Sequence, residues 1–237
     1  MTAYSQRSSQ TELLDRTDIP FEDIRKNMME LNIINKYLGG HSITIAGLKA
    51  VLSKRFKSDV SSKPLLICEI GCGGGDNLSA IQQWCKKRKL SARFIGIDLN
   101  KDCIKFAREN NKLLNVEWIV SDYTDVQFST KPDIIFSSLF CHHFKDRALV
   151  EQLRWMRKNA GLGFFINDLH RHPAAYFSIK FLTYFFSKSY LVKNDAPLSV
   201  LRGFKRNEWK RLLLQAEITN YKLQWKWAFR WLVNYNE

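Results

Sequence analysis

The chain has 237 residues, of which 45% are apolar, and a formal net charge of +14. This length allows one large domain, or one domain with a cap, and the apolar content excludes a globally disordered chain. The positive charge leaves nucleic acid and anionic membranes open as partners. Most of it lies late in the sequence, because residues 171–237 contain twelve Lys and Arg against four Asp and Glu.

The cysteines form an odd set without an obvious pairing. The Ser-, Gln- and Thr-rich N-terminus has no signal-peptide pattern, so free thiols in a cytoplasmic protein are expected. No second Cys or His pair completes a zinc site with Cys68 and Cys72, and no metal is predicted. The set consists of Cys68, Cys72, Cys85, Cys103 and Cys141.

The first 60 residues are predicted to contain a tail followed by helices. Residues 1–17 are expected to be a flexible tail. Apolar residues recur at helical spacing over residues 19–38 and again over 43–56, with a break at Gly39 and Gly40. Residues 18–60 are therefore predicted to form a helical lid on the domain that follows. His41, at the break, is interpreted either as a lid residue or as a plain surface residue.

From Leu65 onward, apolar strand-like runs alternate with amphipathic stretches, which predicts an α/β sheet. Strands are expected at residues 65–69, 92–98, 116–120, 132–138 and 161–167, and helices at 76–89, 101–111 and 146–159. The run at 132–138 is almost wholly apolar, which is typical of a parallel strand buried on both faces.

The rhythm of the sequence changes after residue 168. Residues 173–190 are rich in aromatic side chains at helical spacing, and we expect residues 173–203 to form a helical cap inserted after the fifth strand. The stretch contains Lys180 and is too short for a transmembrane span. A helix is predicted at 206–216, and two strands within 218–235.

A glycine-rich turn lies between the first strand and its helix. The sequence Glu-Ile-Gly-Cys-Gly-Gly-Gly-Asp occupies residues 69–76. Glycine permits positive φ and lets a ligand approach the backbone closely. A dinucleotide site needs a sixth-position glycine, but Asp76 stands there and would repel a pyrophosphate. Together with Glu69, it favours a cationic ligand and argues against an NAD-dependent oxidoreductase.

The pattern Glu-x-Gly-x-Gly-x-Gly resembles the first motif of the class I methyltransferases that use S-adenosylmethionine (SAM), a ligand with a sulfonium, an ammonium and no phosphate. The resemblance covers residues 65–168 and points to the small-molecule branch that acts on polyketides, phenols and quinones. It implies a Rossmann-like, mostly parallel seven-stranded sheet with helices on both faces and an antiparallel last strand. Residues 18–237 would form a single methyltransferase domain.

A narrower resemblance rests on two short stretches. The run Asn-Asp-Leu-His-Arg-His-Pro at residues 167–173, with Asn32, Asn35 and the Leu-Gly-Gly-His of residues 38–41, is similar to methyltransferases found beside bacterial polyketide synthase genes.

Acids at the next two strand ends extend the resemblance. Asp98 ends the second strand, where it implies binding of the ribose hydroxyls, although it could instead cap the next helix. Asp122 follows the third strand, where it implies binding of the adenine amino group, although it could simply begin a loop. The full set of expected cofactor-binding residues is Glu69, Gly71, Cys72, Gly73, Asn77, Asp98, Leu99, Ser121, Asp122, Tyr123 and Ser138.

Histidines near two strand ends are the candidates for catalysis. His142 and His143 follow the fourth strand, and His170 follows the fifth with Asp168 placed to orient it. An imidazole titrates near neutral pH and can accept a proton as the methyl group arrives. The His-His-Phe run could also be purely structural in this branch. His170 and His172 are interpreted as substrate-binding or structural residues rather than as a zinc centre.

The predicted function is SAM-dependent methylation of a small aromatic or lipid-like acceptor, at oxygen or carbon, in secondary metabolism. One alternative is an RNA methyltransferase that uses the basic C-terminal segment. Another is a non-catalytic, SAM-binding partner protein. The sequence leaves the oligomeric state open.

Overall fold

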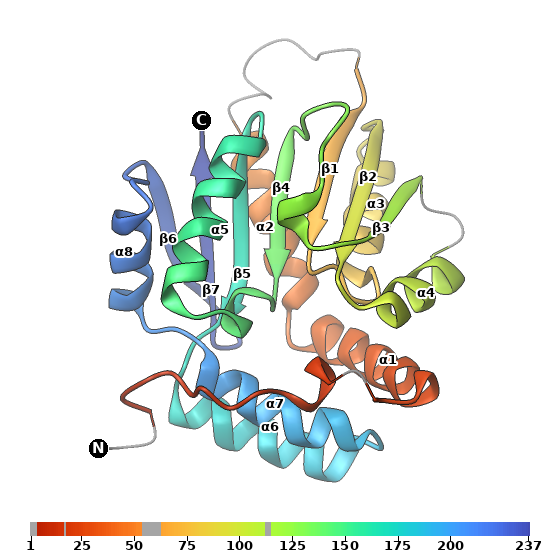
Figure 1. The fold of residues 1–237 in the computed structure, drawn as a ribbon, viewed down its shortest axis with the longest axis vertical. Helices are drawn as coiled ribbons and strands as arrows, with labels where there is room; N and C mark the ends of the chain where they lie inside the picture. The colour runs from red at the N-terminus through yellow and green to blue at the C-terminus, as the bar shows by residue number, and fades with distance from the viewer. Residues whose placement is uncertain (1–3, 17, 54–62, 112–114) are drawn as a thin grey trace.

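A computed structural model describes residues 4–16, 18–53, 63–111 and 115–237. Its centre is a seven-stranded sheet with the order β3-β2-β1-β4-β5-β7-β6 (Figure 1). The strands are β1 (Leu65–Ile70), β2 (Ala92–Asp98), β3 (Val116–Val120), β4 (Ile134–Ser138), β5 (Gly163–Leu169), β6 (Tyr221–Lys226) and β7 (Arg230–Asn236). Neighbours from β3 to β5 are parallel, whereas β7 runs antiparallel to both β5 and β6. The predicted fold class is confirmed.

Helices cover both faces of the sheet because its central strands are apolar on both sides. Ile134 and Phe136 of β4 pack in a core with α2 and α3, while Ile135 packs in a second core with α5 and α8. Each of these strand residues is fully buried. The helices that follow strands or precede the sheet are α1 (Phe21–Tyr37), α2 (Gly40–Leu52), α3 (Asp76–Lys87), α4 (Lys101–Asn110), α5 (Asp146–Asn159) and α8 (Arg206–Gln215).

Two further helices, α6 (Pro173–Phe186) and α7 (Tyr190–Arg202), lie across the carboxyl ends of β4 and β5, as Figure 1 shows. They form the helical insertion expected after the fifth strand. The predicted cap at residues 173–203 spans both helices, and α7 continues through Pro197. Among the described residues, no helix is long and apolar enough to cross a membrane.

The two helices of the predicted lid lie in different places. Helix α1 does lie over the glycine turn, with Met28 beside Gly73 and Gly74. Its Glu30 fastens it to the insertion, since the carboxylate accepts hydrogen bonds from the backbone N–H of Lys188 (2.9 Å) and Ser189 (3.1 Å). Helix α2 instead belongs to the layer of helices on the sheet, because its apolar residues are buried there. Residues 54–60 of the predicted lid lie outside the described residues.

The prediction of a flexible tail is wrong for residues 4–16. This segment packs along α7 and ends in the short 3-10 helix η1 (Leu13–Asp15) (Figure 1). The Arg7 side chain is 13% exposed and donates to the carbonyl oxygens of Phe144 and Arg202, both at 2.8 Å. Glu12 is buried. These buried polar contacts come from distant parts of the chain, so no local pattern of the segment reveals them.

Candidate functional site

The glycine turn after β1 has the backbone that its sequence predicts. Gly71, Gly73 and Gly75 have φ values of +65°, +49° and +76°, a region that other residues rarely adopt. A Cβ atom on Gly71 would lie 2.1 Å from a ring carbon of Phe140, in the loop after β4. Glycine is therefore required for both the turn and the close packing of the β4 loop.

Asp98 fastens the glycine turn to the end of β2. Its carboxylate accepts hydrogen bonds from the backbone N–H of Gly73 (2.8 Å) and of Asn100 (2.9 Å). Burial raises the pKa of Asp98, although both backbone hydrogen bonds act in the opposite direction. Each carboxylate oxygen can accept more than one hydrogen bond, so this arrangement is compatible with ribose binding.

Glu69 presents a carboxylate oxygen that has no partner among the described residues. One oxygen accepts a hydrogen bond from Asn77 at 3.1 Å, while Oε2 is fully buried and unpaired. Burial raises the pKa of Glu69 well above its usual value, and the charge of Asp76 adds to the effect. An unpaired, buried carboxylate is costly unless a donor or a cation meets it. The site therefore fits the positively charged end of SAM.

Asn77, which was expected to bind the cofactor, is occupied by protein groups. Its amide NH2 donates to Glu69, and its carbonyl oxygen accepts a hydrogen bond from Thr44 of α2 at 2.9 Å. Asn77 thus orients Glu69.

Asp76 is held by the N-terminal helices. His41 Nε2 lies 2.8 Å from Asp76 Oδ2, and the Asn35 amide donates to the same oxygen at 3.0 Å. Burial would raise the pKa of Asp76, but His41 lowers it below the usual value. His41 therefore has a specific role, pairing with the helix-opening acid of the turn.

A buried arginine adjoins this group, which sequence reasoning missed. Arg230 at the start of β7 donates to Asn35 Oδ1 at 3.0 Å, and its Nη1 has no hydrogen-bond partner within the described residues. Burial lowers the pKa of Arg230 to about 10. The residue opens a strand in the basic C-terminal part, where one arginine among many gives no signal of its own.

The other expected cofactor residues differ in exposure. Cys72 and Ser138 are buried, Ser121 is half-buried, and Leu99 is 73% exposed. Asp122 is exposed and caps the short helix η3 (Tyr123–Asp125), accepting a hydrogen bond from Thr124 N at 2.9 Å. Tyr123 packs edge-on against Phe140, Phe144 and Trp155 in the core, where burial raises its pKa.

His142 is buried between two carboxylates. Its Nδ1 lies 2.8 Å from Asp168 Oδ1, and its Nε2 lies 3.4 Å from Glu12 Oε1. Burial alone would lower the pKa of His142, but Asp168 and Glu12 raise it to about 9. A free imidazole base at neutral pH, as the sequence suggested for His142, disagrees with this environment. Asp168 orients His142 rather than His170.

His143 is the more accessible of the pair, with a side chain that is 21% exposed. Its ring lies 4.5 Å from that of His142, centroid to centroid. Its Nδ1 is 3.2 Å from Asp15 Oδ1 and its Nε2 is 3.7 Å from Glu12 Oε2. Both histidines sit on the 3-10 helix η4 (Cys141–His143), directly after the Phe140 that packs on Gly71.

His170 is not brought together with the other two. It follows β5, and its Nδ1 accepts a hydrogen bond from Trp225 Nε1 at 3.2 Å. Burial lowers the pKa of His170 to about 4, and the charge of His172 acts in the same direction. It lines a separate open hollow of about 600 Å³ with Arg171, His172 and Trp231.

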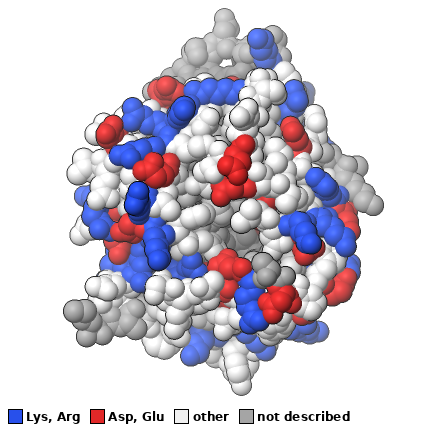
Figure 2. Space-filling view, in the orientation of Figure 1, with Lys and Arg blue, Asp and Glu red and all other residues white. Residues whose placement is uncertain are grey.

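Figure 2 shows one face of the molecule hollowed near its centre, in the region where Figure 1 places the carboxyl ends of β1 and β4. Acidic side chains border the hollow, whereas Lys and Arg are spread around the outline of this face. The glycine turn and the loop of His142 and His143 meet at this edge of the sheet. Ligands of open α/β sheets bind at the carboxyl ends of the strands.

Comparisons with known proteins agree with this geometry. A family model described as "Methyltransferase domain" matches residues 67–161. The plantazolicin methyltransferase BpumL in complex with SAH is similar at 17% identity, with 92% of this chain and 95% of that chain covered and a TM-score of 0.58. Human N-acetylserotonin methyltransferase in complex with SAM is similar at 15% identity, with 92% and 56% covered and a TM-score of 0.63.

Magnesium protoporphyrin IX methyltransferase from Synechocystis PCC 6803, with bound SAH, is similar at 12% identity, with 85% of each chain covered and a TM-score of 0.52. None of the curated proteins compared with the chain matches it. At these identities, the solved structures establish the fold, while the family model identifies the domain. The chain therefore contains a methyltransferase domain at residues 67–161 and has the Rossmann-like fold of these solved methyltransferases.

Proposed function

We propose that residues 18–237 act as one methyltransferase domain that transfers the SAM methyl group to a small, aromatic or lipid-like acceptor. Transfer would be to oxygen or carbon, in secondary metabolism. The main support for an apolar acceptor is the apolar face of α6, which lies at the carboxyl end of the sheet, as the glycine turn does. Phe177, Phe181 and Phe185 are each about 60% exposed there. Exposed apolar surface of this kind is typical of a binding surface.

The solved relatives support the proposal by what they act on. By their titles, they include a methyltransferase for plantazolicin, the CMeT domain of the citrinin polyketide synthase and a methyltransferase for N-acetylserotonin. An RNA acceptor is less favoured, since Lys and Arg on the face in Figure 2 are dispersed among other residues. A cytoplasmic location is proposed because all five cysteines are free and buried.

The cofactor-binding roles follow from the geometry of the strand ends. Glu69 would face the charged methionine end of SAM, Asp98 the ribose and Asp122 the adenine. Methyl transfer is an in-line displacement that the protein accelerates chiefly by alignment and exclusion of water. Proton acceptance from the acceptor is assigned to His143, the more accessible of the pair, because its loop packs on the glycine turn and His170 lies in a separate hollow.

The reaction is tested by incubating the protein with SAM labelled in its methyl group. Phenols, hydroxylated polyketide mimics and total RNA are offered as separate acceptors, and products are detected by mass spectrometry. Label in a phenol or polyketide mimic is the expected outcome. Label in RNA alone would overturn the acceptor class, and SAM binding without transfer to any acceptor would favour a non-catalytic partner protein.

Two histidine variants test where the proton goes. His143→Gln should lower kcat by roughly 100-fold or more, in the range known for general acid–base residues. His170→Gln should keep the wild-type kcat and pH profile, because His170 lies in a different hollow. The assignment is wrong if the two variants show the reverse pattern.

A further inference from the structure

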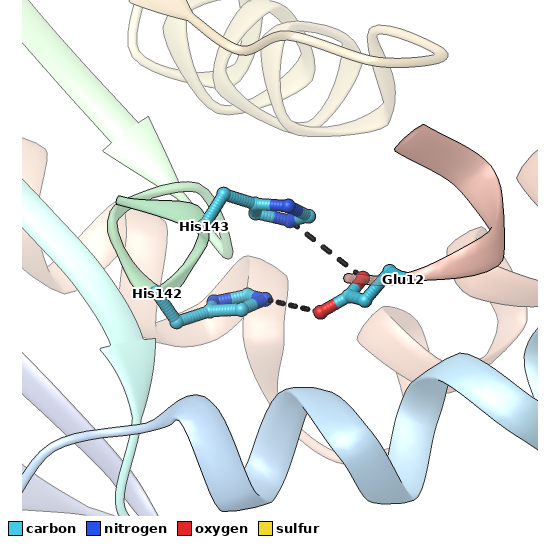
Figure 3. A group of neighbouring side chains, drawn as sticks. All are labelled: Glu12, His142 and His143. Atoms are coloured by element: carbon cyan, nitrogen blue, oxygen red, sulfur yellow. Dashed lines mark ion pairs between the residues drawn. The ribbon is translucent and has the colours of Figure 1, made fainter. Parts of the chain in front are cut away.

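Three side chains from distant parts of the sequence meet beside the glycine turn. Glu12 comes from the N-terminal segment, and His142 and His143 come from η4 after β4 (Figure 3). One ligand atom from each lies within 4.8 Å of the others. The Nε2 atoms of both rings face the Glu12 carboxylate, at 3.4 Å for His142 and 3.7 Å for His143.

These separations match the edges of a small coordination polyhedron. Zinc binds imidazole nitrogen and carboxylate oxygen at about 2.0–2.2 Å, so two ligands of a tetrahedral ion lie roughly 3.3–3.6 Å apart. The distances from Glu12 to the two rings fall at or close to that range. The two rings face different oxygens of Glu12, and all three ligand atoms lie within 4.8 Å of one another, so side-chain movement would bring them to one ion.

The other ring nitrogen of each histidine is already held by a carboxylate. His142 Nδ1 lies 2.8 Å from Asp168, and His143 Nδ1 lies 3.2 Å from Asp15. Metal-binding histidines commonly donate their second N–H to a carboxylate, which fixes the tautomer and aims the free nitrogen at the ion. Here that arrangement occurs twice, and Ser199 Oγ further orients Glu12 by donating to Oε1 at 2.7 Å.

The charges of the cluster also suit a cation. Three carboxylates, those of Glu12, Asp15 and Asp168, surround the two imidazoles. Arg202 lies near two of them, with Nη1 3.9 Å from Glu12 and 3.6 Å from Asp15. A divalent ion bound at the two Nε2 atoms would displace any protons there and place its charge among these carboxylates.

We propose that Glu12, His142 and His143 bind a divalent cation of the zinc class and leave its fourth position open. The ion would tie the N-terminal segment to the loop whose Phe140 packs on Gly71. Its open position would take water or an acceptor oxygen and lower the pKa of that group. With an ion bound, His143 would hold the metal, and the proton would leave from the metal-bound oxygen to solvent. Cation binding itself does not depend on which acceptor is methylated.

Titration calorimetry of the chelator-treated full chain with zinc chloride tests the site, with magnesium chloride as a second arm. We expect one zinc per chain with a Kd of about 1 µM or below and no comparable magnesium binding. The five cysteines are buried and do not compete in the folded protein. Failure of zinc to bind, or a preference for magnesium, would overturn the proposal.

Zinc affinities of single variants distinguish binding at this site from binding at other histidines. Glu12→Gln and His143→Asn should each weaken zinc binding by roughly 100-fold, and Asp15→Asn by about 10-fold through loss of the orienting carboxylate. His172→Asn is the matched control and should bind zinc like the wild type. Circular dichroism establishes that each variant is folded. Unchanged zinc affinity in both Glu12→Gln and His143→Asn contradicts the site.

Anomalous diffraction at the zinc edge from zinc-soaked crystals supplies a measurement independent of any variant. A peak between Glu12 and the two rings supports the proposal, whereas a peak elsewhere, such as at His170 and His172, overturns it. Since none of these measurements uses an acceptor, the metal site can fail while the proposed methylation stands, and the reverse.

Discussion

At the scale of single residues, the cofactor site depends on how Glu69 is buried. Asn77 satisfies one of its carboxylate oxygens, and the other has no partner among the described residues. A group in that position is unstable as an anion in the free protein and becomes favourable when a positive ligand arrives. The same residue thus couples cofactor binding to pH.

Glu69→Gln should weaken SAM binding by roughly 10- to 100-fold, because an amide cannot make a charge-assisted contact. In the wild type, affinity should rise with pH above the usual range of a carboxyl group, since the pKa of Glu69 is raised in the free protein and a cationic ligand favours the ionised form. The variant should lack this rise. Calorimetry across that pH interval measures both effects, and the exposed Glu22→Gln serves as the control.

A Glu69→Gln protein that binds SAM with wild-type affinity and pH dependence would show that the unpaired oxygen does not meet the cofactor.

At the scale of elements, the N-terminal segment acts as a strap between the insertion and the loop after β4. Arg7 contacts carbonyl oxygens of both, and Arg171 Nε donates to the backbone oxygen of Tyr4 at 3.1 Å. The segment has little regular structure, yet its polar contacts are buried. Its stability therefore comes from tertiary hydrogen bonds rather than from local propensity.

Arg7→Ala should lower the free energy of unfolding by about 1–3 kcal/mol, because several buried carbonyl oxygens lose their donor. Urea denaturation followed by tryptophan fluorescence measures the change. Arg16→Ala provides the control within the same segment, since Arg16 pairs only with the exposed Asp18 and its loss should not be measurable. Equal effects of the two substitutions would mean that the segment does not act as a strap.

At the scale of the whole molecule, one edge of the sheet gathers the glycine turn, the histidine loop, α1 and the insertion. Several aromatic side chains of α6, in the predicted cap, are exposed, including Tyr184 (68%) and Phe186 (77%). Phe181 and Phe185 contact each other, with ring centroids 4.6 Å apart. The molecule therefore presents an apolar surface on α6, at the carboxyl end of the sheet.

Replacing both Phe181 and Phe185 by Ser should raise KM for an apolar acceptor by about tenfold or more, since burying one such ring contributes about 1.5–3 kcal/mol. Thermal stability and SAM affinity should stay near wild type, because these rings contribute little to the core. Steady-state kinetics with a phenolic acceptor measures the change. An unchanged KM would exclude this face of α6 from acceptor binding.

How far the sequence predicts the structure depends on the range of the interactions involved. The bounds of β2 and β3, the glycine turn and the place of Asp98 follow from local features, because strand periodicity and positive φ are properties of neighbouring residues. The helical cap at residues 173–203 was likewise predicted from local spacing, although Pro197 lies inside α7. Asn77 was predicted to bind the cofactor from its place in the glycine motif. Its hydrogen bond from Thr44 could not be predicted, because Thr44 belongs to a separate helix.

The sequence by itself determined the fold class and predicted the cofactor. Short local motifs indicate both. The acids that end successive parallel strands lie at the same edge of the sheet. Only the tertiary structure decided what surrounds the histidines. It separated His170 from His142 and His143, and it brought Glu12 to that pair from about 130 positions away in the sequence. Contacts over such a distance depend on how the chain packs, and no local pattern records them.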